Sequence, residues 1–523
     1  MTSLPAADNL AAAFAAHGTD RCFGHPGSGA NLDVIAAFEA LGIPFVLSHT
    51  ETAACIMAST YGYLRNQVVP AVVTRGRGAA SAITGAAQAT LDRQSLALIT
   101  DTVPASLAER VPHQRLNQRA MVRAVSKASV TFGATSTADE LATLLDFSQR
   151  SPAGAIHINY DNIGTPSGFE APEPAEPLHS RKNVTNRVLE SERPVVICGL
   201  GAAAAAHELT TTLLEFAAPV LTTYQGIGVV PTEHPQSAGL FTNGAAERPL
   251  LEQADLIITI GLDPVELIPA SWPYSVPVIS FATHPTADPY FPIEAELVGD
   301  LGDLCHQHLL ASHTWPANTG ADYRTTVRNT LTPVHEEEGF FGAIDLVMAT
   351  IASAPDPVTI TVDSGAHYLA VMPFWPAAEP KRVLISNGLA AKGYAVPAAI
   401  GAALARPGEP VIAFVGDGGI GMTLAELETI VRLELPITVM VSNDSALSLM
   451  ELKQREGRGT TSAVRFNGTD FATVARGMGM EAEVVASRVQ LEGVLSQGWG
   501  APRLIDARID PVDYPHMMQI TKG

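Results

Sequence analysis

The chain has 523 residues and a formal net charge of −21, and it is 46% hydrophobic but only 16% charged. This hydrophobic content excludes global disorder, and the length predicts about three domains. The shortage of basic residues argues against nucleic acid as a main partner, because binding phosphates needs stripes of Lys and Arg.

The start of the chain and its cysteines bear on where the protein works. The first 14 residues have no basic region and carry Asp8, unlike a signal peptide. No run of about 20 apolar residues is free of charges or breakers, which predicts no membrane span. The four cysteines lie too far apart to suggest a disulfide framework: Cys22, Cys55, Cys198 and Cys305. We therefore expect a cytoplasmic protein.

Residues 1–165 alternate between helical patterns and short apolar runs. A helix is expected from Leu10, a second over 51–65 and a third that ends at Leu91. A first strand is expected within 21–29, where it runs into a loop, and further strands are expected at 44–49, 70–74, 96–100 and 155–159. Alternation of this kind predicts a parallel, doubly wound α/β domain. Residues 164–183 hold four prolines and no apolar period, which predicts a linker.

Two further α/β domains are expected, over 184–312 and 335–523, with a second linker at 312–322. Strands of the central domain are predicted at 194–198, 219–225, 256–261 and 277–282. Those of the third domain are predicted at 358–363, 382–386, 410–415, 436–442 and 503–508. The predicted fold class is thus three doubly wound parallel-sheet domains.

Polar residues end two neighbouring strands of the third domain. The first strand runs into Gly416-Asp417-Gly418, a helix follows, and the next strand ends at Asn443-Asp444. A strand–helix–strand unit places both ends at the carboxyl edge of the sheet, where ligands bind. Glycines let the backbone approach a phosphate, and the carboxylates suit Mg²⁺ beside a diphosphate. Two tight turns are the plain alternative, and the spacing of the two polar ends disfavours it.

The stretch GDGGIGMTLAELETIVRLELPITVMVSND resembles the thiamine diphosphate fingerprint of the acetohydroxyacid synthase and pyruvate or benzoylformate decarboxylase superfamily. The resemblance implies thiamine diphosphate and Mg²⁺ as cofactors. It implies metal binding by Asp417, Asp444 and the carbonyl of Ala446, and cofactor binding by residues that include Gly416, Gly418, Gly419 and Asn443. The sequence departs from the family where Asp444 replaces an Asn, which adds negative charge to the metal site.

The resemblance continues over nearly the whole chain. ISNGLAAKGYAVPAAIGAALA (385–405) matches the family's segment before GDG, and VDSGAHYLAV (362–371) matches its loop near the middle of the cofactor. There Leu369 takes the position of an apolar residue that bends thiamine, with His367 beside it. Ordinary core packing is the alternative for Leu369.

Glu51 takes the position of the family's essential glutamate, at the start of ETAACIMASTYGYLR. The resemblance implies that its carboxylate bonds N1′ of the aminopyrimidine and promotes the imino form, which removes the C2 proton. A Glu at a helix N-terminus also has a plain role with the helix dipole.

Three loops of the first domain resemble substrate loops of the family. CFGHPGSGAN supplies Ser28 and His25, and HQRLNQ supplies the catalytic candidates Gln114 and His113. In TRGRG, Arg75 and Arg77 are candidates for an anionic group of the substrate. Surface or interface arginines are the alternative.

Two patterns in the central domain are expected to be misleading. GLGAAA (199–204) imitates a dinucleotide fingerprint, but it lacks the third glycine and the later acid, and IGLDPVELIP lacks an Arg-bearing flavin segment. The spacing of Cys305, His306, His308 and His313 fits no zinc pattern.

By the resemblance, we expect pyrimidine-binding, central and diphosphate-binding domains in a homodimer or homotetramer with active sites at the subunit interface. The implied function is decarboxylation or carboligation of a 2-oxo acid through a C2 ylid and enamine, like acetolactate synthase. The alternative enzyme is a C–C lyase or hydrolase without decarboxylation, and a cofactor-binding regulatory protein is the non-enzymatic alternative.

Overall fold

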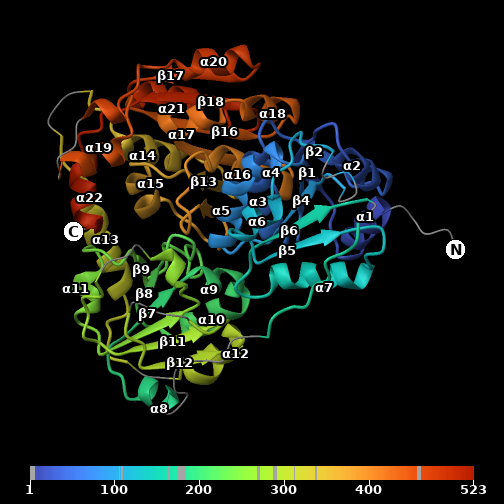
Figure 1. Ribbon diagram of the computed structural model, residues 1–523. Helices are drawn as coiled ribbons and strands as arrows, with labels where there is room; N and C mark the ends of the chain where they lie inside the picture. The colour runs from blue at the N-terminus through green and yellow to red at the C-terminus, as the bar shows by residue number, and fades with distance from the viewer. Residues whose placement is uncertain are drawn as a thin grey trace.

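The computed structural model describes residues 6–104, 107, 110–162, 164–173, 184–267, 271–286, 291–310, 313–335, 339–455, 457 and 461–522. They form three α/β domains, each built on a six-stranded sheet whose named strands pair only in parallel. In Figure 1 the first domain is blue to cyan, the central domain is mostly green to yellow, and the third is orange to red. The predicted fold class is confirmed.

The first domain has the strand order β2-β1-β3-β4-β6-β5. Its strands are β1 (Cys22–His25), β2 (Phe45–Leu47), β3 (Pro70–Val73), β4 (Leu96–Asp101), β5 (Ala128–Phe132) and β6 (Ala155–Tyr160). Its helices are α1 (Ala6–Ala16), α2 (Asn31–Ala40), α3 (Glu51–Arg65), α4 (Arg77–Ser81), α5 (Ile83–Leu91), α6 (Gln118–Arg123) and α7 (Ala138–Gln149).

The central domain has the strand order β12-β11-β10-β7-β8-β9. Its strands are β7 (Pro194–Cys198), β8 (Val220–Thr222), β9 (Ser237–Leu240), β10 (Leu256–Ile260), β11 (Val278–Ala282) and β12 (Ala295–Val298). Its helices are α8 (Val184–Leu189), α9 (Leu200–Ala204), α10 (Ala206–Phe216), α11 (Arg248–Leu251), the short 3-10 helix η2 (Pro264–Glu266) and α12 (Leu301–His308).

The third domain has the strand order β14-β13-β15-β16-β18-β17. Its strands are β13 (Thr359–Val362), β14 (Val383–Ile385), β15 (Val411–Gly416), β16 (Ile437–Asn443), β17 (Glu481–Val485) and β18 (Arg503–Arg508). Its helices are α14 (Ala343–Ser353), α15 (Tyr368–Phe374), α16 (Ala395–Ala405), α17 (Asp417–Thr423), α18 (Glu426–Arg432), α19 (Ser448–Arg455), η3 (Thr461–Val464), α20 (Phe471–Gly477), α21 (Arg488–Leu495) and α22 (Tyr514–Lys522).

The predicted linkers differ in their structure. Residues 164–173 contain no helix or strand, and residues 174–183 lie outside the described residues. The second predicted linker, 312–322, is partly helical, because α13 (Thr319–Leu331) begins within it. Tertiary contacts hold this helix: the buried Arg324 donates from Nη1 to the carbonyls of His234, at 3.1 Å, and Ser237. A polar sequence can therefore be helical here.

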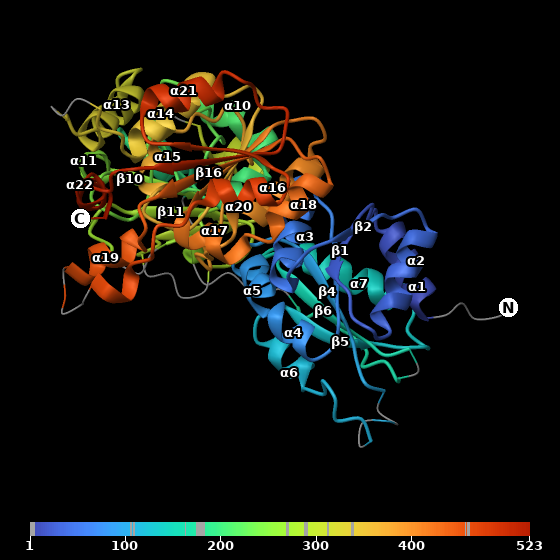
Figure 2. The same ribbon diagram turned by 90° about the horizontal axis from the view of Figure 1, so that it is seen from above.

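Helices α3 and α16 join the first and third domains along one continuous hydrophobic core. They lie side by side in Figures 1 and 2. The contact is close because both helices are rich in small residues. A Cβ at Gly401 would lie 2.6 Å from the main-chain oxygen of Met57, so only glycine fits there. The first and third domains are thus packed as one unit.

Two consecutive residues after α5 tie the first domain to both others. Asp92 accepts hydrogen bonds from the main-chain N–H groups of Asn387 (3.0 Å) and Gly388 (2.6 Å) in the third domain. Arg93 forms a two-pronged ion pair with Asp263 in the central domain, at 2.7 and 3.1 Å. These contacts set the orientation of the three sheets. Over the described ranges, no helix is long and apolar enough to cross a bilayer.

Candidate functional site

The most polar sheet edge of the third domain carries a cavity of about 320 Å³. Its floor forms where β15 and β16 end, because Gly416 pairs with Ser442 and brings the two polar strand ends next to each other. The wall is completed by the segment after β13, by α19 and by Tyr514 at the start of α22. Among the predicted site residues, the cavity lining includes His367, Gly416, Asp417, Gly418, Gly419, Asp444 and Ala446.

The carboxylates of Asp417 and Asp444 converge on one point of this cavity. Both accept from the main-chain N–H of Ala446, at 2.9 Å from Oδ2 of Asp417 and at 3.2 Å from Oδ1 of Asp444. Burial, and then the negative charge of Asp444, raise the pKa of Asp417 to about 7. Burial also raises the pKa of Asp444, whose second oxygen accepts from Ser448. Two acids held this close favour a cation between them.

A close contact beneath the floor fixes the path of the chain after Asp417. A Cβ on Gly419 would lie 1.8 Å from Oδ2 of Asp363, so a side chain is excluded. Asp363 is fully buried at the end of β13 and accepts from the main-chain N–H groups of Gly393 (3.0 Å) and Tyr394 (2.7 Å). Desolvation raises its pKa to about 6. Asp363 thus packs the loop before α16 against α17.

His367 is buried at the cavity wall, and its Nε2 has no hydrogen-bond partner within the described part of the chain. Burial lowers the pKa of His367 to about 4, so the imidazole is neutral at pH 7. The neighbouring Tyr368 also lines the cavity, whereas Leu369 lies in the hydrophobic core behind it. A neutral imidazole with a free nitrogen can bond an oxygen or a hydroxyl of a ligand.

Asn443 turns away from the cavity. Its amide Nδ2 donates to Oδ1 of Asp506 (2.8 Å) and to the carbonyl of Thr469 (3.2 Å). It therefore supports the loop by hydrogen bonding, and the oxygen donors at this strand end come from Asp444 and from the main chain of Ala446.

Glu51 is the first residue of α3 and is only 2% exposed. Its Oε1 has no hydrogen-bond partner among the described residues, and the cation of Arg77 lies 3.7 Å away. A buried carboxylate oxygen without a partner costs free energy unless a ligand satisfies it. Glu51 does not line the cavity of Asp417.

The candidates in the first-domain loops differ in their burial and contacts. His25 ends β1 and its Nδ1 bonds the carbonyl of Ser48 (2.9 Å), while Ser28 is exposed. Gln114 has a left-handed backbone with φ of 56°, a rare conformation for residues other than glycine, and His113 is exposed. The main chain of Gln114 packs on the TRGRG loop, where a Cβ on Gly76 would clash with it.

The two candidate arginines have different surroundings. Arg75 binds the fully buried Asp101 twice, from its main-chain N–H (2.8 Å) and from Nη1 (3.1 Å). Asp101 also accepts from Asn31 at 2.9 Å. Arg77 begins α4 with a side chain that is 70% exposed. Its guanidinium lies 3.7 Å from Glu51 but is otherwise exposed, so it is the more accessible of the two to a ligand.

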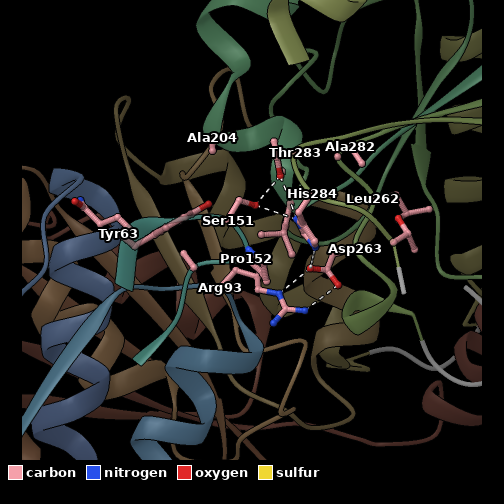
Figure 3. Close-up of a pocket in the computed structure, with 16 residues that line it drawn as sticks. Tyr63, Arg93, Ser151, Pro152, Ala204, Leu262, Asp263, Ala282, Thr283 and His284 are labelled. Atoms are coloured by element: carbon pink, nitrogen blue, oxygen red, sulfur yellow. Dashed lines mark hydrogen bonds and ion pairs between the residues drawn. The ribbon is translucent and has the colours of Figure 1, made fainter. Parts of the chain in front are cut away.

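A second pocket, of about 180 Å³, lies at the carboxyl edge of the central sheet against the first domain (Figure 3). Ser151 lies beside His284, with its Oγ 2.9 Å from Nδ1, and Arg93 points at Asp263. At the adjoining strand end, the glycine turn of GLGAAA is closed by the protein itself. There the carboxyl group of Glu266 accepts from the N–H of Leu200 (2.9 Å) and from Thr223. Burial raises the pKa of Glu266 to about 8.

The first of the two sites fits a metal ion and a diphosphate-bearing cofactor. Two carboxylates and a main-chain oxygen are the hard donors that Mg²⁺ prefers, and Gly416 to Gly419 leave room for phosphate oxygens. Nowhere in the described ranges do three or more His, Cys, Asp or Glu side chains gather to hold a metal. The ligands that complete a metal site here must therefore come from the main chain and from the cofactor.

Sequence reasoning missed Asp363, Glu426 and Tyr514. Asp363 could have been identified by its position, because it is an acid that directly follows the buried strand β13. Glu426 is buried and bonds main-chain N–H groups of His49 and Thr50 in the first domain. Tyr514 reaches the cavity from the end of the chain. These last two depend on contacts between distant segments, which no local pattern signals.

Comparison with protein families gives three matches in chain order. Residues 5–121 match the model of the "Thiamine pyrophosphate enzyme, N-terminal TPP binding domain", and residues 182–307 match its central domain. Residues 363–507 match the "Thiamine pyrophosphate enzyme, C-terminal TPP binding domain". Asp417 and Asp444 lie within the last of these, and Glu51 within the first.

Similar curated proteins extend over nearly the whole chain. "Acetolactate synthase" of Bacillus subtilis (strain 168) is 29% identical over 531 residues, which cover 95% of this chain and 91% of that protein. "Acetolactate synthase, catabolic" of Raoultella terrigena is 28% identical, with coverage of 98% and 96%. "Acetolactate synthase isozyme 3 large subunit" of Escherichia coli (strain K12) is 26% identical, with coverage of 100% and 98%.

The two arginines of the TRGRG loop should differ in their effect on stability. Arg75→Ala removes the cation beside buried Asp101, and we expect it to lower the free energy of unfolding by about 2–4 kcal/mol. Arg77→Ala removes a side chain that is 70% exposed and only 3.7 Å from Glu51, and it should change the free energy of unfolding by less than about 1 kcal/mol. Urea unfolding followed by circular dichroism measures both. Equal losses in the two variants would contradict this assignment.

Proposed function

The chain is a member of the thiamine pyrophosphate enzyme family, and on this premise we propose that it is an acetolactate synthase-like enzyme. It decarboxylates one 2-oxo acid and joins the remaining fragment to a second carbonyl compound. The names of the full-length relatives support this reaction. The observation that carries it is the pairing of a two-carboxylate, glycine-lined cavity with the buried Glu51, whose Oε1 has no hydrogen bond within the described part of the chain.

The third domain supplies the anchoring end of the site. Asp417, Asp444 and the carbonyl of Ala446 would hold Mg²⁺, and Gly416–Gly419 would leave room for the diphosphate of the cofactor. The free Nε2 of His367 bonds an oxygen of the bound ligand. When bound, thiamine diphosphate supplies a nucleophilic thiazolium carbon that adds to a 2-oxo acid and accepts the electrons released with CO₂.

The first domain supplies the activating end. Glu51 donates or accepts a hydrogen bond at N1′ of the aminopyrimidine, depending on its protonation, and this bond is the missing partner of its buried Oε1. Because Glu51 does not line the cavity of Asp417, we propose a homodimer or homotetramer in which each site takes Glu51 from one chain and Asp417 from another. The cofactor then lies at the subunit interface.

The loops around Glu51 are proposed to hold the substrate. His25, Ser28, His113 and Gln114 are the candidate proton donors and hydrogen-bonding groups. Of the two arginines, Arg77 is the better candidate for the substrate carboxylate, because Arg75 already binds Asp101. A cytoplasmic location remains a prediction.

Turnover of a panel of 2-oxo acids with thiamine diphosphate and Mg²⁺ tests the proposed reaction. We expect CO₂ release from pyruvate together with a coupled acetolactate product. CO₂ release with only an aldehyde would indicate a simple decarboxylase. Cleavage without CO₂ would overturn the proposal in favour of a C–C lyase or hydrolase.

Asp417→Ala should abolish Mg²⁺-dependent retention of thiamine diphosphate. Loss of a side chain that supports a metal ligand costs 10–100-fold in affinity, so loss of the ligand itself should cost at least about 100-fold. Equilibrium dialysis measures the dissociation constant with and without Mg²⁺. Asp444→Asn is the matched control, since its amide oxygen can still bind the metal, and it should stay within about tenfold of wild type. Unchanged affinity in Asp417→Ala would overturn the metal assignment.

Glu51→Gln should keep cofactor affinity but slow exchange of the cofactor C2 proton by about 10²–10⁴-fold, the usual contribution of proton transfer in catalysis. The carboxylate is remote from the diphosphate anchor, so affinity and exchange separate. Hydrogen–deuterium exchange of the bound cofactor, quenched with acid and read by NMR, gives the rate. Exchange at the wild-type rate would show that Glu51 is not the activating acid.

A further inference from the structure

Glu426 is a buried acid that the proposed reaction does not yet use. It is the first residue of α18, in the third domain, and is 1% exposed. Its Oε1 accepts from the main-chain N–H groups of His49 (3.0 Å) and Thr50 (3.2 Å) in the first domain. Its Oε2 accepts from Oγ1 of Thr429 at 2.9 Å. The two bonds to Oε1 join this carboxylate to the two residues that precede Glu51.

Burying a carboxylate at a contact between two domains costs free energy. Burial disfavours its charge and raises the pKa of Glu426, whereas an apolar side chain of similar size would carry no such cost. The acid fixes the orientation of the peptide that it binds, because two adjacent N–H groups donate to the same oxygen. Thr50 is the N-cap residue of α3, so the bonded peptide leads directly into Glu51.

The same loop is held from its other side by the first domain. The hydroxyl and the N–H of Ser48 both donate to the carbonyl of Gly24, each at 3.0 Å. Oγ1 of Thr50 accepts from the N–H of Ala53 at 3.1 Å. The carboxylate of Glu51, by contrast, has no hydrogen bond on its Oε1. Apart from the cation of Arg77 at 3.7 Å, its direction therefore depends on the backbone of residues 48–51, which is fixed between β1 and Glu426.

We propose that Glu426 is a positioning residue for Glu51. Its carboxylate holds the peptide of His49 and Thr50, and this hold aims the Glu51 side chain at the aminopyrimidine. Figure 2 shows α18 beside the part of the first domain that carries β2 and α3. The proposal rests on the proposed function, in which Glu51 activates the cofactor.

Nearby contacts on the protein surface provide a matched control. Glu428, one residue beyond Leu427 on the same helix, pairs with Nε2 of His49 at 2.8 Å, and both side chains are 41% exposed. This pair reaches the same loop through a side chain, without bonding its peptide. Glu428→Ala should therefore leave the direction of Glu51 unchanged.

Four variants of the full chain test the proposal: Glu426→Ala, Glu426→Gln, Glu426→Asp and Glu428→Ala. Three quantities are measured for each: C2 exchange of the bound cofactor, the dissociation constant of thiamine diphosphate, and the thermal midpoint. We expect Glu426→Ala and Glu426→Asp to slow exchange by at least about tenfold, since misplacement by 1 Å can cost about 10²-fold. Cofactor affinity should stay within about threefold, because the metal and diphosphate donors are untouched.

Glu426→Gln distinguishes position from charge. Its amide oxygen still accepts from both N–H groups, so exchange should stay within about threefold of wild type, as it should in Glu428→Ala. Exchange as slow in Glu426→Gln as in Glu426→Asp overturns the proposal, because charge rather than position would then matter. Parallel losses of exchange, affinity and thermal midpoint also overturn it, since they indicate a purely structural role. If Glu426→Ala does not fold, the Asp and Gln variants carry the test.

The variants distinguish a failure of the Glu426 proposal from a failure of the proposed function. Normal exchange in Glu51→Gln overturns the proposed role of Glu51, and the role of Glu426 with it. Slow exchange in Glu51→Gln with normal exchange in Glu426→Ala and Glu426→Asp overturns only the positioning role of Glu426.

Discussion

The close packing of α3 against α16 is the contact on which the arrangement of the candidate site depends. It requires small residues, above all Gly401, whose Cα faces the main chain of Met57. Each helix begins at a functional segment. Glu51 starts α3, and the loop before α16 is held by Asp363, which also packs on Gly419 next to Asp417. One helix pair thus fixes where Glu51 and the floor of the Asp417 cavity lie within the chain.

The site keeps several polar groups in states that a folded protein avoids elsewhere. Asp417 and Asp444 face each other, Glu51 has a bare oxygen, and His367 is neutral with a bare nitrogen. Each of these costs stability in the free protein. A cation and an anionic, heteroaromatic ligand would satisfy all of them together. The unfavourable groups lie on rigid elements, at strand ends and helix starts, so the protein cannot relieve them by collapsing.

Much of this could be predicted from the sequence, and the limits have a physical cause. The central strands are buried on both faces, so they read as apolar runs, and β15 and β16 were predicted together with the polar residues that end them. The strands that the pattern missed, β5, β9, β12 and β17, all lie at sheet edges. Edge strands are partly exposed and carry polar residues, as in Glu481–Val485, so they lack an apolar run. The partner of Arg75 was equally hidden, because Asp101 lies 26 residues away.

The central domain uses its ligand-binding edge to join domains. In a doubly wound sheet, ligands bind where the strand order reverses, here between β7 and β10. At that point Glu266 places its own carboxyl group on the N–H of Leu200, and its carbonyl accepts from Nδ2 of Asn387 in the third domain at 2.7 Å. Asp263, three residues earlier, holds Arg93 of the first domain. Groups at this edge that could have bound a ligand instead contact the protein itself, including the neighbouring domains. The loop of Asn387 and Gly388 leads to the segment before α16 that Asp363 holds, next to the floor of the Asp417 cavity. This loop is consequently held by the first domain through Asp92 and by the central domain through Glu266.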